Sequence, residues 1–323
     1  MDAIIARFSE DKDFQSTVAG VENGLKEQIV SGLGGSSRAL FTAALYRKVK
    51  RPIAFVTHNL NQAQKFAEDL SEFLSKEDVK LYPADEWIAA DIVVNDPAYD
   101  SERIAVLSTL LQGFRGVLVL PYTGLRKKLV PFDVFRSAHI TLSEGHQIEM
   151  EDVTGKLVET GYSRVDMVER KGEFSVRGGI VDVFPPSFDN PLRIEWFDDE
   201  IDTIRAFNVS DQRSLKRQRE VVLPPARELF ASFEQLYQSG DRLVNKLNDQ
   251  LRRVKDPKVK NKLHEQIGDD IEQFKQGQLF PGIHKYISLI YPACAHLTDY
   301  MPKDTVLLYD DPSRIQETAK QMD

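Results

Sequence analysis

The sequence has a single cysteine, Cys294, among its 323 residues. A disulfide needs two thiols and a structural zinc site normally uses several, so a disulfide framework and a cysteine-rich zinc site are both excluded. No apolar run approaches the roughly 20 residues that a membrane span needs. The first residues, MDAIIARFSEDKDF, also lack the basic stretch and apolar core of a secretion signal. We therefore expect a cytoplasmic protein that has no membrane partner.

An excess of positive charge is also missing. The sequence has 50 acidic and 42 basic residues, which give a formal net charge of −8. This balance argues against a protein dominated by attraction to phosphate backbones. Two short basic strips, at residues 126–128 and 215–219, are left as candidates for a local DNA contact. A solvated linker is the favoured interpretation of each strip, because short runs of charge usually face water.

Two kinds of strand pattern divide the chain. Continuous apolar runs at 51–56 and 117–120 and a short strand at 79–82 alternate with helical patterns, which is typical of a parallel sheet covered by helices. A run at 305–309 has the same character. Residues 161–197 instead alternate between apolar and polar, which is typical of half-buried antiparallel strands. The predicted fold class is α/β: a parallel-sheet domain split by an inserted small α+β domain with an antiparallel sheet.

The predicted domain limits follow the change of pattern. Residues 1–127 form the first part of the parallel-sheet domain, 128–214 the inserted domain, and 215–323 the returning part. The returning part contains two long polar helices, at 228–250 and 259–276, which we expect to pack as an antiparallel pair. A length of 323 residues with 41% hydrophobic residues suits two or three modest globular domains.

The small sheet carries two arginines of interest. Its expected strands are 172–176, 180–184 and 192–197, and Arg164 and Arg177 are long cations on strands flanked by apolar and aromatic residues. An apolar floor with guanidinium groups suits a protein partner that carries carboxylates. On residue type alone, the solvated face of a sheet is nevertheless the favoured interpretation of both arginines.

A glycine-rich stretch before residue 40 can be compared with the phosphate-binding pattern G-x-x-x-x-G-K-[ST]. Gly32 fits the first glycine, but Ser37 replaces the second glycine, Arg38 the lysine and Ala39 the hydroxyl residue. Alanine cannot bind magnesium, and serine is disfavoured where the loop needs a glycine conformation. The stretch therefore reads as a degenerate nucleotide site. An ordinary strand-to-helix turn is the other interpretation, and both predict no hydrolysis here.

An acidic pair, Asp310 and Asp311, follows the apolar run at 305–309. Such a pair holds magnesium in nucleotide hydrolases. It can also cap the next helix, and this role is favoured because the phosphate loop is defective. No catalytic residue and no metal site are predicted. His58 has no catalytic partner at a useful spacing, and the acidic residues 198–200 fit a turn between strands better than a cation site.

Three blocks of the small sheet, residues 162–164, 172–178 and 181–185, resemble the small second domain of the UvrB family. The family includes UvrB, a bacterial helicase subunit of nucleotide excision repair, and Mfd, the transcription-repair coupling factor. The resemblance is stronger to the matching domain of Mfd, and it covers nearly the whole chain. It implies the N-terminal UvrB-like module of Mfd, in which a degenerate helicase (RecA-like) domain carries the insert.

The resemblance also implies a partner and the residues that meet it. In the family the small domain binds UvrA. The family's partner-contacting arginines match Arg164 and Arg177, and its phenylalanine before proline matches Phe184. UvrB has a further arginine where this chain has Ser175, and this departure favours Mfd over UvrB. UvrA is thus the expected partner, docked through an arginine-bearing face of the inserted domain.

The resemblance finally bears on activity. The motor domains that make Mfd an ATP-dependent DNA translocase do not occur in this sequence, so we expect a non-hydrolytic fragment of a longer protein. No cofactor is expected for this chain, since ATP and magnesium would belong to the motor domains. RNA polymerase and DNA would be bound by the rest of the protein. Two alternatives stay open: an active UvrB-like ATP-dependent DNA helicase subunit, and a DNA-contacting scaffold.

Overall fold

The computed structural model describes residues 1–84 and 97–322. The chain divides into two compact units, one of residues 1–94, 109–127 and 297–323, the other of residues 95–108 and 128–296. The first unit is built on a parallel sheet and the second on an antiparallel one, so the predicted α/β fold class is confirmed. The predicted limits at residues 127 and 214 stay predictions.

The sheet of the first unit has four parallel strands in the order β12-β1-β3-β2. Their bounds are β1 Ile53–Thr57, β2 Val79–Leu81, β3 Val117–Pro121 and β12 Val306–Tyr309. Every residue of β1 and β3 is buried, which explains why these segments read as continuous apolar runs. The edge strand β12 comes from the far end of the chain and pairs with β1.

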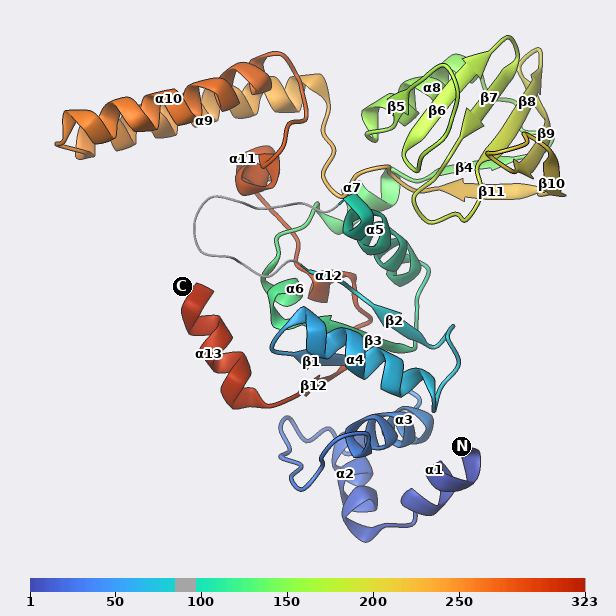
Figure 1. Cartoon of the computed structure of the whole chain (residues 1–323), viewed down its shortest axis with the longest axis vertical. Coiled ribbons are helices and arrows are strands. Elements are labelled where there is room, and N and C mark those ends of the chain that lie inside the picture. The colour runs from blue at the N-terminus through green and yellow to red at the C-terminus, as the bar shows by residue number, and fades with distance from the viewer. Residues whose placement is uncertain (85–96, 323) are drawn as a thin grey trace. The chain divides into compact units, whose positions relative to one another are not determined.

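Helices α3 (Ser37–Val49) and α4 (Leu60–Ser71) share one hydrophobic core with the strands of this sheet, and α4 lies against the sheet (Figure 1). Helix α4 begins after Asn59, whose side chain accepts a hydrogen bond from the Gln62 amide at 2.9 Å. The Phe55 and Phe66 rings stack with their centres 3.5 Å apart and so join β1 to α4. The other helices of this unit are α1 Asp2–Phe8, α2 Lys12–Glu22, α6 Tyr122–Arg126, α12 Leu297–Tyr300 and α13 Pro312–Met322.

The second unit contains a six-stranded sheet in the order β10-β9-β8-β7-β6-β5. Neighbouring strands are antiparallel, except that β5 runs parallel to β6. The bounds are β5 Ser163–Arg164, β6 Glu173–Arg177, β7 Ile180–Val183, β8 Leu192–Phe197, β9 Glu200–Phe207 and β10 Ser214–Arg217. Along β8 buried and partly exposed residues alternate, as the period-two pattern predicts.

A two-stranded sheet and a helix complete the core of this small sheet. Strand β4 (Ile140–Ser143) pairs antiparallel with β11 (Glu220–Leu223), and α8 (Met150–Glu159) packs on the same core. The predicted limits place residues 220–223 in the returning part of the parallel-sheet domain, whereas β11 pairs with β4 of the small domain. A short apolar run does not reveal which strand it pairs with. In the structure the pairing with β4 places this run in the small domain.

The predicted helical pair is α9 (Phe233–Arg253) and α10 (Pro257–Lys275). An added Cβ on Gly240 would lie 3.1 Å from Cβ of Phe274, so the start of α9 meets the end of α10 and the pair is antiparallel. Residue 228 lies before α9 rather than inside it, because Ser232 caps this helix: its hydroxyl accepts from the Gln235 amide at 3.2 Å, and the Gln235 side chain accepts from the Ser232 amide at 3.0 Å. The other helices are α5 Pro97–Leu111, α7 Phe132–Ser137, η1 Ile283–Tyr286 and α11 Ile287–Ile290.

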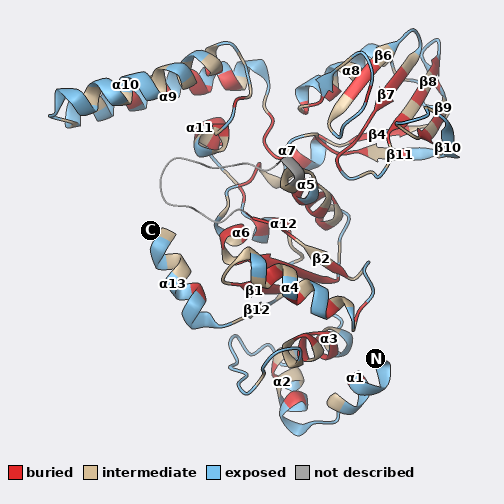
Figure 2. Cartoon of the chain, viewed as in Figure 1, coloured by how far each residue is buried: buried red, intermediate tan, exposed pale blue. Residues whose placement is uncertain are grey.

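Burial follows the two sheets and the inner surfaces of the helices (Figure 2). Of the described helices, not one combines the length and the apolar character that crossing a membrane requires.

Candidate functional site

The six-stranded sheet has a core face and an outer face, and the outer face carries charge. Strand register places Ser175 beside Asp182, and Asp182 beside Arg193. Arg177 lies on the same face, opposite Ile180. Since successive side chains of a strand point to opposite faces, the apolar residues between these positions fill the core. The outer face therefore brings two arginines to one carboxylate.

Asp182 is the centre of this arrangement, with only 2% of its surface exposed. Its Oδ1 accepts from Arg193 Nε at 2.7 Å, and its Oδ2 accepts from Arg193 Nη2 at 2.8 Å and from Arg177 Nη2 at 2.7 Å. These hydrogen bonds raise the pKa of Arg193. Arg193 also stacks over Phe207, 4.6 Å from the ring centre. The buried carboxylate is thus compensated by two guanidinium groups.

Arg177 differs from Arg193 in its exposure. Its side chain is 52% exposed, whereas that of Arg193 is 19% exposed. Arg177 uses one Nη2 hydrogen bond to Asp182, so most of the donors of its fork face solvent. The structure consequently shows a cation that is both accessible and held in one orientation.

Arg164 lies at the other end of this region, on the short edge strand β5. It is exposed, and among the described residues it has no hydrogen bond or ion pair. Its register partner is Phe174, which points into the core, while Arg177 three residues later points to the outer face. The two arginines therefore start from opposite sides of the sheet at this edge, and the docking of a partner through them stays a prediction.

Phe184 follows β7 and is only 8% exposed. Its amide donates to the Glu173 carbonyl at 2.9 Å, and its carbonyl accepts from the Gly172 amide at 2.7 Å. It offers little surface to a partner and instead holds the strand end next to Gly172. Ser175 is buried beside Asp182, and within the described part of the chain its hydroxyl has no hydrogen-bond partner.

The degenerate nucleotide loop lies in the first unit. Residues 1–36, all described, contain no strand, so the stretch from Gly32 is not the strand-to-helix turn that was one interpretation. Helix α3 begins at Ser37, whose hydroxyl accepts from the Gly34 amide at 2.9 Å and donates to the Gly34 carbonyl at 2.8 Å. Ala39 is fully buried in the core under the sheet. The Ser37 hydroxyl is thus bonded within the loop, and the residue at the position of the motif's hydroxyl is packed in the core.

The acidic residues after β12 contact protein groups. Asp310 forms an ion pair with Arg38 at 2.6 Å. Asp311 accepts a hydrogen bond from the Arg314 amide at 3.3 Å and thereby caps the start of α13. It also forms an ion pair with Arg314 Nε at 3.2 Å. Within the described part of the chain, no cluster of three or more His, Cys, Asp or Glu residues could hold a metal ion.

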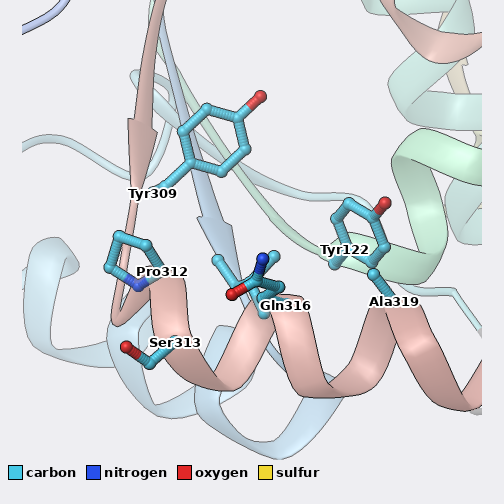
Figure 3. Close-up of a pocket in the computed structure, with 7 residues that line it drawn as sticks. Tyr122, Tyr309, Pro312, Ser313, Gln316 and Ala319 are labelled. Atoms are coloured by element: carbon cyan, nitrogen blue, oxygen red, sulfur yellow. The ribbon is translucent and has the colours of Figure 1, made fainter.

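A groove of about 450 Å³ lies beside this acidic strand end (Figure 3). Tyr122 and Tyr309, which follow β3 and end β12, line it together with the first turns of α13. In open α/β sheets, ligands bind beyond the carboxyl ends of the strands, which is where this groove lies. The lining residues include no lysine or arginine, and burial raises the pKa of Tyr309 above its usual range. The groove therefore lacks the cations that a triphosphate requires.

The structure brings together residues that the sequence did not single out. Asp182 on β7 and Arg193 on β8 each alternate with apolar residues. This alternation is the sequence signal that could have placed both side chains on the outer face of the sheet. Their pairing needed the register of β7 and β8, which a sequence alone does not specify.

Comparison with known proteins identifies the small sheet. Residues 140–229 match the family model of the UvrB interaction domain, which spans β4 to β11 and includes Arg164, Arg177 and Phe184. This part of the chain is thus similar to the UvrB interaction domain.

Over its whole length the chain is related to transcription-repair-coupling factors. It is 40% identical over 322 residues to that of Bacillus subtilis, which covers 100% of this chain and 27% of the relative. The factor of Staphylococcus epidermidis is 32% identical over 330 residues and that of Staphylococcus aureus 31% over 331 residues, each with 27% of the relative covered. The chain spans about a quarter of these relatives, and the resemblance to the UvrB-like module of Mfd is confirmed.

Proposed function

We propose that this chain is the UvrA-docking module of a transcription-coupled nucleotide-excision-repair factor. The observation that carries the proposal is Arg177, 52% exposed yet held by the buried Asp182 within the UvrB interaction domain. A cation with a restrained rotamer loses less side-chain entropy on binding than a free one. A carboxylate of UvrA could accept from the donors of Arg177 that face solvent.

Arg164 would supply the second cation of the docking site. Because it lies on the β5 edge and starts from the other side of the sheet, UvrA would meet this edge as well as the outer face. Phe184 would contribute by holding the end of β7 rather than by a large contact of its own. Opposed charges on the two proteins would accelerate encounter, and the few desolvated contacts would set the residence time.

A binding titration with purified UvrA tests the docking site. Arg177→Ala should weaken binding about tenfold to a hundredfold, as expected for the loss of a paired and partly desolvated charge. Arg213→Ala is the matched control, because Arg213 is a more exposed arginine of the same domain, with an ion pair to Asp211 at 3.9 Å. Unchanged binding in both Arg164→Ala and Arg177→Ala would remove the docking site.

We also propose that this chain neither binds nor hydrolyses ATP and takes no cofactor. The Arg38–Asp310 ion pair supports this. Arg38 occupies the position of the phosphate-loop lysine and Asp310 that of a magnesium ligand, and here the two side chains bind each other. A titration of the chain with ATP and magnesium tests it. Micromolar binding would overturn the proposal and favour the alternative, an active UvrB-like helicase subunit. ATP-dependent DNA translocation, with the DNA contacts that it requires, and contacts with RNA polymerase would belong to parts of the longer protein outside this chain.

A further inference from the structure

The joined end of α9 and α10 concentrates positive charge that the docking function does not use. Residues 246–262, which we call the hairpin tip, contain seven lysines and arginines and two aspartates. The whole chain has a formal charge of −8, so the tip is a strongly basic part of an acidic protein. Figure 1 shows the two helices side by side up to the turn that joins them, and Figure 2 shows this end largely exposed.

The two aspartates neutralise little of this charge. Asp249 forms a long ion pair with Arg252 at 3.7 Å, and both side chains are exposed. Asp256 caps α10 by accepting from the Lys258 amide at 2.8 Å, so its carboxylate serves the helix. Residues 246–262 are all described, and within them the pair of Arg252 and Asp249 is the one ion pair. The remaining cations are available to a ligand.

The lysines at the start of α10 lower the stability of this helix. Lys258, Lys260 and Lys262 lie in its first two turns, and its first turn has no acidic residue. Cations at a helix N-terminus are disfavoured by the helix dipole. Lys258 and Lys262 are also four residues apart, where like charges repel. Folding of the helix therefore does not account for these charges, which indicates a role toward an external anion.

The chemistry of the tip favours phosphate over protein. Its exposed large hydrophobic residue is Val259, and residues 238–273 contain no aromatic side chain. Protein interfaces normally have an apolar and aromatic centre, whereas phosphate backbones are bound by cations alone. We propose that the hairpin tip binds the phosphate backbone of duplex DNA without reading its sequence. The two basic strips at 126–128 and 215–219 play no part in this inference.

The test is fluorescence anisotropy of the full chain with a labelled mixed-sequence DNA duplex, as a function of salt. The tip variant is Lys255→Gln, Lys258→Gln and Lys262→Gln. The matched control is Lys12→Gln, Lys26→Gln and Lys76→Gln, which removes the same charge from exposed lysines of the first unit. At about 50 mM NaCl the tip variant should bind about tenfold or more weakly, and the slope of log K against log salt should decrease by up to about 2.7. The control variant should bind like the parent chain.

Three results would overturn the proposal. One is a parent chain that does not bind the duplex at about 50 mM NaCl. Another is a tip variant with the affinity and salt slope of the parent, or a control variant that loses as much. The third is tip-dependent binding to poly-L-glutamate without tip-dependent binding to DNA, which would identify an acidic polypeptide as the partner.

Discussion

Nη1 of Arg38 lies 2.6 Å from Oδ2 of Asp310, and this ion pair joins residues 272 positions apart in the sequence. Arg38 stands where a phosphate loop has its lysine, and Asp310 directly follows β12, where nucleotide hydrolases place a magnesium ligand. Their side chains are 32% and 11% exposed. At these two positions the charges of Arg38 and Asp310 compensate each other.

Arg38→Ala should lower the free energy of unfolding of the parallel-sheet unit by about 1–2 kcal/mol, because Asp310 is left mostly buried without its cation. Thermal unfolding of the chain measures the change. The double variant Arg38→Ala and Asp310→Asn should recover part of the loss. Strictly additive effects of the two substitutions would contradict the coupling.

Restoring the loop residues should not restore nucleotide binding. In the variant Ser37→Gly, Arg38→Lys and Ala39→Thr, the new hydroxyl would sit where Ala39 is packed in the core, and no strand precedes the loop in residues 1–36. We expect no micromolar ATP affinity by isothermal titration with magnesium, and reduced stability from the buried threonine. Micromolar affinity in this variant would show that the loop residues alone had been limiting.

Arg193→Ala and Arg177→Ala should differ in their effect on stability. Arg193 provides two hydrogen bonds to the buried Asp182 and is itself largely buried, so its loss should cost about 3 kcal/mol. Arg177 is half exposed and provides one hydrogen bond, so its loss should cost less than about 1 kcal/mol. Urea unfolding followed through Trp196 in the same sheet measures both. Equal costs would argue against Arg193 as the main partner of Asp182.

His139 should make the stability of the second unit depend on pH. Its ring lies between the Phe135 carbonyl, 2.9 Å from Nδ1, and the Ser108 hydroxyl, 3.0 Å from Nε2, and burial lowers its pKa below the ordinary 6.5. Below pH 6.5 the unfolded chain binds the proton before the folded one, so stability falls as the pH decreases toward the folded pKa and levels off beneath it.

The melting temperature should therefore be lower at about pH 5.5 than at about pH 7.5, and His139→Gln should reduce this difference because it removes the titrating group. Other groups titrate equally in both proteins, so the comparison isolates His139. An unchanged difference in the variant would exclude His139 as its source.

Gly161→Ala should destabilise the small sheet by about 1–3 kcal/mol. Gly161 has φ of +92°, and an added Cβ would lie 2.9 Å from Cγ of Arg227. Gly155→Ala is the control, because Gly155 lies within α8 and an added Cβ would meet nothing within 4 Å. That substitution should stabilise by up to about 1 kcal/mol through helix propensity. Thermal unfolding compares the two, and a neutral Gly161→Ala would contradict the strained conformation.

The sequence predicted the elements better than their partners. Continuous apolar runs at β1 and β3 and the alternation along β8 predicted strands, because burial on two faces or one face is a local property of each segment. The pairing of β11 with β4 was missed, since a run of four residues does not contain its partner.

By itself, the sequence determined the α/β class, the loss of the phosphate-loop residues and the likeness to the UvrB interaction domain. These depend on which residues occur and in what spacing. The tertiary structure decided that Arg38 binds Asp310, that Asp182 orients Arg177, and that Arg164 starts from the other side of the sheet. Each of these depends on strand register and on contacts between distant segments, and such contacts form only when the chain has folded.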